Sequence, residues 1–154
     1  MSIPSLEDLR AFIVRAHRNG YATGGAESGD DPDAGKILRY EDGAFRYLDR
    51  YYGSRSFVGL ETVFYDDVPV WGMHYHGSPT NEAVDHDPVY VVLRSALAAV
   101  SDESPFRGPR TFDRDGYRYQ TEFEGTIRRF SGTETIESGE EVVYRGRYSG
   151  CVID

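Results

Sequence analysis

An aspartate in an otherwise aromatic row is the residue of this sequence best suited to chemistry. Residues 44–52 alternate as a β-strand does, which puts Asp49 on one face with Phe45, Tyr47 and Tyr51. A carboxyl group among rings loses water, which by itself raises its pKa. Asp49 is therefore a candidate acid or base, with Glu61 as its catalytic partner. The structural alternative is a fixed ion pair with an arginine of the neighbouring strand, such as Arg39.

Aromatic and arginine side chains around this carboxyl group are candidates for a binding pocket. Rings and guanidinium groups together suit an aromatic or anionic small molecule. The candidate ligand-binding residues are Arg46, Tyr47, Asp49, Tyr51, Trp71, Tyr75 and Arg107. If the site is catalytic instead, we expect Asp49 to work with Arg46 or with a histidine.

Two histidines raise the question of a metal site. His74 and His76 share one face of a predicted strand, and Glu61 is expected to be a diagonal neighbour of His74 across the hairpin. Three ligands with such loose spacing resemble ordinary surface side chains more than a zinc site. We therefore expect no metal and no cofactor, with His74 and His76 as the weak candidates if a metal does bind.

Composition narrows the class of protein. The chain has 154 residues and a net charge of −9, and Lys36 is the single lysine among its 17 basic residues. Such a charge opposes nucleic-acid binding by this chain alone, which needs a basic surface. It favours a salt-loving source, with a GC-rich genome as the other explanation. The sequence shows no apolar run of membrane-spanning length and no export signal, which predicts a cytoplasmic protein.

An internal repeat organises these residues. Phe57, Gly59 and Glu61 recur as Phe130, Gly132 and Glu134, always 73 positions later (130 − 57 = 73). Tyr75 and Gly77 recur as Tyr148 and Gly150 at the same separation. Fixed spacing over several positions indicates duplication. The sequence predicts one domain, residues 1–154, made of two repeats at about 5–77 and 87–150.

Each repeat is expected to contain a helix followed by four strands. Apolar residues recur at helical spacing after Ser5, and again after Pro88, where the second helix is expected to be almost wholly buried. Asn19-Gly20 is expected to end the first helix, and turns are expected at residues 41–43 and at Asp66-Asp67. The predicted fold class is α+β, with two helices packed on a curved antiparallel sheet. In the second hairpin, Leu60 is expected to lie opposite Met73 and to face the core.

Three strings carry a resemblance to a known family. They are Phe45-Arg46-Tyr47-x-Asp49-Arg50-Tyr51-Tyr52-Gly53, Pro69-x-Trp71-Gly72-Met73-x-Tyr75-x-Gly77 and Pro105-Phe106-Arg107-Gly108-Pro109. Over nearly its whole length the chain resembles an uncharacterised domain family of bacteria and archaea, sometimes fused to a Cro/repressor-type helix-turn-helix. That fusion implies effector sensing, although the two helices of this chain are too far apart to form such a module.

Three functions are consistent with these residues. The leading hypothesis is a module that binds a small molecule in an aromatic and arginine-lined pocket. The second is an enzyme that uses Asp49, and the third is a protein-interaction domain, with a homodimer as one form.

Overall fold

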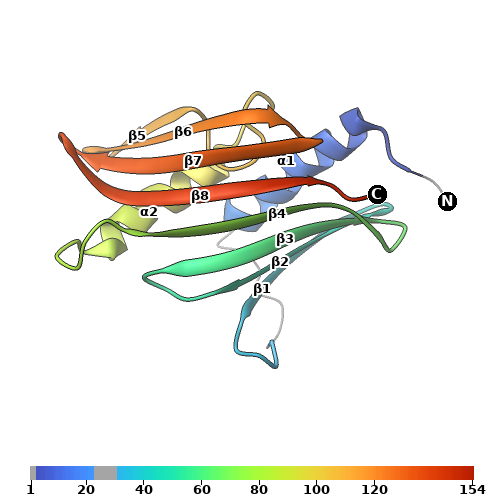
Figure 1. Ribbon diagram of the computed structural model, residues 1–154, viewed down its shortest axis with the longest axis horizontal. Coiled ribbons are helices and arrows are strands. Elements are labelled where there is room, and N and C mark those ends of the chain that lie inside the picture. Colours follow the sequence, from blue (N-terminus) through green and yellow to red (C-terminus); the bar gives the residue numbers. More distant parts are fainter. Residues whose placement is uncertain (1–2, 23–30) are drawn as a thin grey trace.

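The chain folds into one antiparallel sheet with two helices on the same side of it (Figure 1). The computed structural model describes residues 3–22 and 31–154. Its elements are α1 (Leu6–Ala22), β1 (Lys36–Asp42), β2 (Phe45–Tyr52), β3 (Phe57–Tyr65), β4 (Val68–Pro79), α2 (His86–Ala98), β5 (Thr111–Arg114), β6 (Tyr117–Thr126), β7 (Arg129–Ser138) and β8 (Glu141–Val152). The predicted α+β class, with helices packed on an antiparallel sheet, is confirmed.

The two halves of the sheet have the same internal order. The eight strands lie in the order β1-β2-β3-β4-β8-β7-β6-β5, so that β4 and β8 join two four-stranded meanders. Gly59 pairs with Tyr75 in one half, and Gly132 pairs with Tyr148 in the other. The register shifts after Val63 in β3 and after Ile136 in β7, again 73 positions apart (136 − 63 = 73). The origin of the two halves by duplication of one ancestral unit stays a prediction.

Helix α1 begins as the sequence predicts and ends later. Ser5 caps it: its Oγ donates to Asp8 Oδ2 at 2.8 Å and accepts from the Asp8 amide at 3.0 Å. The helix continues past Asn19-Gly20 to Ala22. Its buried stripe packs on the sheet and contains His17 beside apolar residues, namely Leu9, Phe12, Ile13 and Ala16. The prediction that Asn19-Gly20 stops the helix was wrong.

Helix α2 is amphipathic, which corrects the expectation that it would be almost wholly buried. Asp85 caps it by accepting from the Asp87 amide at 3.1 Å. Its buried face consists of Val89, Tyr90, Val92, Leu93, Ala96 and Leu97. Val91 and Arg94 lie outside this buried face and are exposed. The buried face meets the sheet and α1.

The register of the β3–β4 hairpin differs by one residue from the prediction. Asp66 and Asp67 form the turn with φ of 48° and 64°, and a bulge follows at Val63/Phe64. Leu60 therefore lies opposite His74, and Glu61 lies opposite Met73. A shift of one residue moves every side chain to the other face. Leu60 is 53% exposed, whereas Glu61 is fully buried.

The surface charge leads to a prediction about salt. A net charge of −9 repels itself, and salt screens that repulsion. We expect the melting temperature to rise with potassium chloride, by about 2–4 °C for each kcal/mol gained. Sucrose at equal osmolality controls for non-ionic effects. A melting temperature that stays flat or falls would count against adaptation to salt.

Candidate functional site

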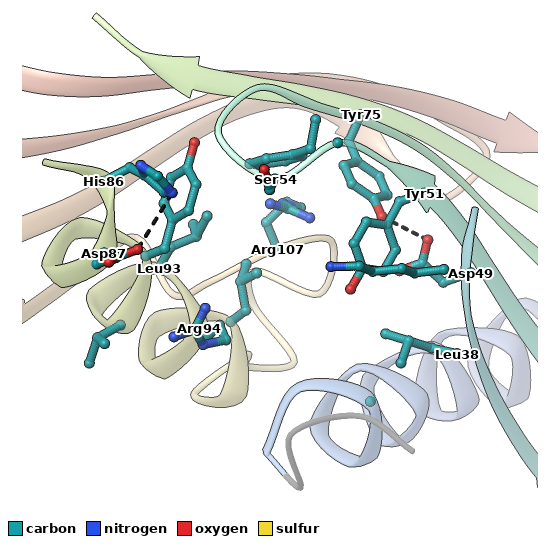
Figure 2. Close-up of a pocket in the computed structure, with 17 residues that line it drawn as sticks. Leu38, Asp49, Tyr51, Ser54, Tyr75, His86, Asp87, Leu93, Arg94 and Arg107 are labelled. Atoms are coloured by element: carbon teal, nitrogen blue, oxygen red, sulfur yellow. Dashed lines mark hydrogen bonds and ion pairs between the residues drawn. The ribbon is translucent and has the colours of Figure 1, made fainter. Parts of the chain in front are cut away.

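A pocket of about 410 Å³ lies between α2, the C-terminal part of α1 and the first half of the sheet (Figure 2). Its walls are mainly aromatic and aliphatic, with Leu38, Tyr51, Phe57, Tyr75, Tyr90, Leu93 and Leu97. Its charged or titratable residues are Lys36, Asp49, His86, Asp87, Arg94 and Arg107. An apolar cavity with a few convergent polar groups is the usual form of a small-molecule site.

Asp49 is the buried acid of this pocket. It lies in the middle of β2, between Leu38 on β1 and Glu61 on β3, and is 1% exposed. The Tyr75 hydroxyl donates to Asp49 Oδ1 at 2.7 Å, and Asp49 Oδ2 has no hydrogen-bond partner among the described residues (Figure 2). Burial raises the pKa of Asp49 well above its usual 3.8, the Glu61 carboxyl raises it further, and the Tyr75 hydroxyl and Arg107 oppose the change. A neutral Asp49 carries its proton on Oδ2, because Oδ1 accepts from Tyr75.

A glycine on β3 sets the position of the Tyr75 ring. Gly59 lies opposite Tyr75, and a Cβ on Gly59 would come within 2.3 Å of the Tyr75 ring and hydroxyl. Because Gly59 has no side chain, the ring lies across β3, and its hydroxyl reaches Asp49 on β2. Gly132 does the same for Tyr148, whose hydroxyl is 2.6 Å from Thr121 Oγ1. Thr121 therefore occupies in the second half the place that Asp49 occupies in the first.

Glu61 belongs to a buried contact beside the pocket. Its Oε1 is 2.5 Å from Nε2 of His17, and both side chains are fully buried. Nδ1 of His17 lies 2.8 Å from the carbonyl oxygen of Pro105, which can only accept, so Nδ1 carries a proton. Glu61 does not line the pocket. This arrangement fixes α1 to β3 and to the connector after α2.

Arg107 closes the pocket from that connector. Its guanidinium donates to both oxygens of Glu134, at 2.7 and 3.2 Å, and both side chains are 2% exposed. Glu134 also accepts from the hydroxyls of Tyr119 and Tyr144, at 2.7 and 2.9 Å. Burial, followed by the charge of Glu134, raises the pKa of both tyrosines well above their usual value. The other side of Arg107 faces the pocket, 4.8 Å from the centre of the Tyr75 ring.

The structure brings four of the seven candidate ligand-binding residues together. Asp49, Tyr51, Tyr75 and Arg107 line the pocket. The Arg39 ion pair proposed as the structural alternative is wrong, because the β1 neighbour of Asp49 is Leu38. Arg107 lines the pocket while its guanidinium group pairs with a buried acid, Glu134.

The other three candidates lie outside the pocket. Arg46 is on the opposite face of β2, 3.5 Å from Asp67 and stacked over Phe64 at 4.0 Å. Tyr47 and Trp71 are core residues: the Tyr47 ring meets the edge of His17, and Trp71 stacks on Phe130 with centroids 5.6 Å apart. Arg46 therefore cannot assist Asp49 from where it stands.

Glu61 cannot join His74 and His76 in a metal site, because the one-residue difference in the hairpin register places Glu61 on the opposite face of the sheet. His74 and His76 are exposed on the outer face of β4, whereas Glu61 points into the core. These histidines border a second depression of about 780 Å³, lined mainly by exposed side chains. Within the described residues, Asp85, His86 and Asp87 place three potential ligand atoms within 4.8 Å of one another. Helix capping already accounts for Asp85 in that cluster.

Several pocket residues were not singled out from the sequence. Lys36 and Arg94 carried one signal each, since Lys36 is the only lysine and Arg94 interrupts the apolar pattern of α2. His17, which contacts Glu61 beside the pocket and does not line it, carried no such signal, because a histidine in an apolar helical stripe is usually a core residue.

A protein-family model covers most of this site. It matches residues 49–153, from Asp49 to the end of β8, and is described as a domain of unknown function (DUF5680). The chain belongs to the DUF5680 family. The DUF5680 match includes Asp49, Tyr75, Arg107 and Glu134, while α1 and β1 precede it. No curated protein and no solved structure matches the chain. None of the helices in the described ranges is long and apolar enough to span a membrane.

Proposed function

We propose that this protein binds a small organic molecule in the pocket that contains Asp49. The observation that carries the proposal is Asp49 itself: a buried carboxyl group that lines a cavity and has one oxygen without a partner among the described residues. A buried polar atom left unpaired costs free energy. A ligand that supplies the missing hydrogen bond recovers that cost, so Asp49 is suited to hold a polar group within apolar walls.

The surrounding groups support binding rather than a structural ion pair. Arg107 is neutralised by Glu134, and Glu61 is held by His17. Neither of these pairs includes Asp49, which accepts a hydrogen bond from the Tyr75 hydroxyl. A neutral Asp49 offers an O–H donor to an acceptor on the ligand. The expected role is effector sensing, in line with the fusion to DNA-binding modules that the family resemblance implies.

An enzyme is the second candidate, because a buried acid with a raised pKa also suits a general acid. His86 lines the same pocket and replaces Arg46 as the candidate partner of Asp49. Conversion of a bound compound, followed by mass spectrometry, distinguishes an enzyme from a sensor. The third hypothesis, a protein-interaction domain such as a homodimer, is supported by a different observation: Val58 and Leu60 on β3 are apolar and exposed.

A metabolite screen by thermal shift tests the proposed function. We expect compounds that raise the melting temperature of the native protein to lose their effect in Leu93→Trp, which fills the pocket, and in Asp49→Leu. Thr121→Val is the matched control, because it changes the equivalent position in the other half and leaves the pocket intact.

Circular dichroism first shows that each variant is folded. The proposal is wrong if stabilising compounds act equally on the native protein and on folded Leu93→Trp, or if a broad screen of small metabolites yields none.

A further inference from the structure

A phenylalanine fills, in the second half of the molecule, the space that is open in the first. Phe106 is fully buried and stacks on Phe130, with centroids 3.8 Å apart and planes 10° apart. It also meets the Phe123 ring edge-on at 5.1 Å and lies 6.3 Å from Tyr148. These three rings form an aromatic cage around a planar group.

The first half has the equivalent three rings at the pocket, where one of them, Phe57, also meets the Tyr90 ring edge-on at 5.8 Å. The repeat makes Phe57 the equivalent of Phe130, and Tyr75 the equivalent of Tyr148. Tyr51 corresponds to Phe123, because each lies two positions beyond the equivalent pair Asp49 and Thr121. All three residues of the first half line the pocket. The Phe106 ring therefore marks, by the symmetry of the two halves, where a planar group fits in the pocket.

Two cations border this cage in a strongly acidic protein. Lys36 and Arg94 line the pocket, and within the described ranges neither forms an ion pair. Lys36 Nζ lies 5.7 Å from the centre of the Tyr51 ring. Figure 2 shows Arg94 on α2, across the pocket from Asp49. His86 is engaged with Asp87 at 3.5 Å, which leaves Lys36 and Arg94 to attract an anion.

From the cage and the cations we infer that the ligand is a planar aromatic molecule with an anionic substituent. Its ring lies among Tyr51, Phe57 and Tyr75, and its anionic group lies near Lys36 and Arg94. Ring stacking and cation–anion attraction then supply the affinity. This inference rests on the proposed function, since it names the chemical class of ligand for the same pocket.

Matched probes test the inference. Phenylpropionate, cyclohexylpropionate and phenylpropionamide share a chain length and differ in ring planarity or charge, while phenyl phosphate tests another anion. Ligand-observed NMR at millimolar concentration detects binding, and calorimetry measures affinity. We expect phenylpropionate or phenyl phosphate to bind about tenfold more tightly than the saturated or the neutral compound, which corresponds to about 1.4 kcal/mol. Tighter binding of phenylpropionate indicates a carboxylate ligand, and tighter binding of phenyl phosphate indicates a phosphate ligand.

Variants locate the anionic group. Lys36→Gln/Arg94→Gln should weaken the anionic probes about tenfold and remove most of the dependence of binding on salt. Arg129→Gln/Arg145→Gln removes the same charge from exposed positions of β7 and β8 and should leave binding unchanged. The inference is overturned if the saturated or neutral compound binds as well as the aromatic anions, or if the Lys36 and Arg94 changes have no effect.

The proposed function and the proposed class of ligand would be contradicted by different results. If none of the four probes binds, while compounds from the metabolite screen still act through Asp49 and Leu93, the ligand class is wrong and the pocket function stands. If the metabolite screen also gives no compound that depends on Leu93, the proposed function is wrong as well.

Discussion

Replacing Arg107 by methionine is expected to destabilise the fold by about 3–5 kcal/mol. The change leaves the Glu134 carboxyl group buried without its cation, although the hydroxyls of Tyr119 and Tyr144 still donate to it. It also removes the guanidinium group from the face of Tyr75. Chemical denaturation gives the free energy of unfolding of each variant.

Two further variants make this result specific to the buried pair. The double change Arg107→Met/Glu134→Gln should recover much of the loss, because no charge is then stranded. Arg118→Met removes an exposed arginine that also forms two hydrogen bonds with a carboxylate, Asp113, and should cost less than about 1 kcal/mol. Equal losses for Arg107→Met and Arg118→Met would contradict the structural role given to Arg107.

Replacing Asp49 by leucine is expected to weaken ligand binding about tenfold to a hundredfold. The change leaves the ligand's polar group without a hydrogen bond in an apolar pocket, at a cost of about 1–3 kcal/mol. Asp49→Asn should retain most of the binding, because its amide can donate where the Asp49 Oδ2 proton does. Calorimetry with the strongest compound from the screen measures both. Loss of binding in a folded Asn variant would show that the ligand needs the carboxylate instead.

The same residue gives a pH dependence of stability. The pKa of Asp49 is raised in the folded state, so the folded protein holds this proton more tightly than the unfolded chain does. The stability from this proton is complete below the usual value of 3.8 and is lost as pH rises through the folded-state pKa. Asp49→Asn should therefore match the native protein in acid and exceed its stability in alkali. A difference between the two proteins that stays constant with pH would contradict this assignment.

Much of the fold follows from local signals in the sequence. The Ser5 cap and the apolar stripe after it predict α1, and the internal repeat at a separation of 73 residues predicts a second set of strands. Alternation along β2 correctly places Asp49 among aromatic side chains. These features depend on neighbours in sequence, or on a spacing that can be counted, which is why they can be read without a structure.

The face on which Glu61 lies could not be predicted in the same way. It depends on the bulge at Val63/Phe64, where β4 contains one extra residue, Val70, between Pro69 and Trp71. Counting outward from Asp66-Asp67 therefore put Leu60 inside and Glu61 beside His74. The repeat held a clue, since Glu134 recurs at the position of Glu61, and both prove to be buried acids with a cationic or histidine partner.

The pocket depends on contacts between residues far apart in the chain. Asp49, Tyr51 and Tyr75 were foreseen from strand periodicity and aromatic character. The positions of Arg94, Lys36 and Phe106 depend on how α2 and its connector lie across the two halves of the sheet, which spacing along the chain does not reveal. The relation between Phe106 and the pocket can be seen only when the two halves are compared in space.

NMR of the aspartate carboxyl carbons tests the central claim most directly, because it observes Asp49 itself. In the free protein, Asp49 should titrate above 3.8, and Asp31, which accepts from the Asp33 amide and from Tyr52, should titrate below it. Asp49→Asn identifies the Asp49 signal by its absence. Saturation with the strongest compound from the screen should move the Asp49 signal and displace its titration while the Asp31 signal stays in place. A compound that binds and leaves the Asp49 signal and its titration unchanged would contradict the assignment of this pocket as the binding site.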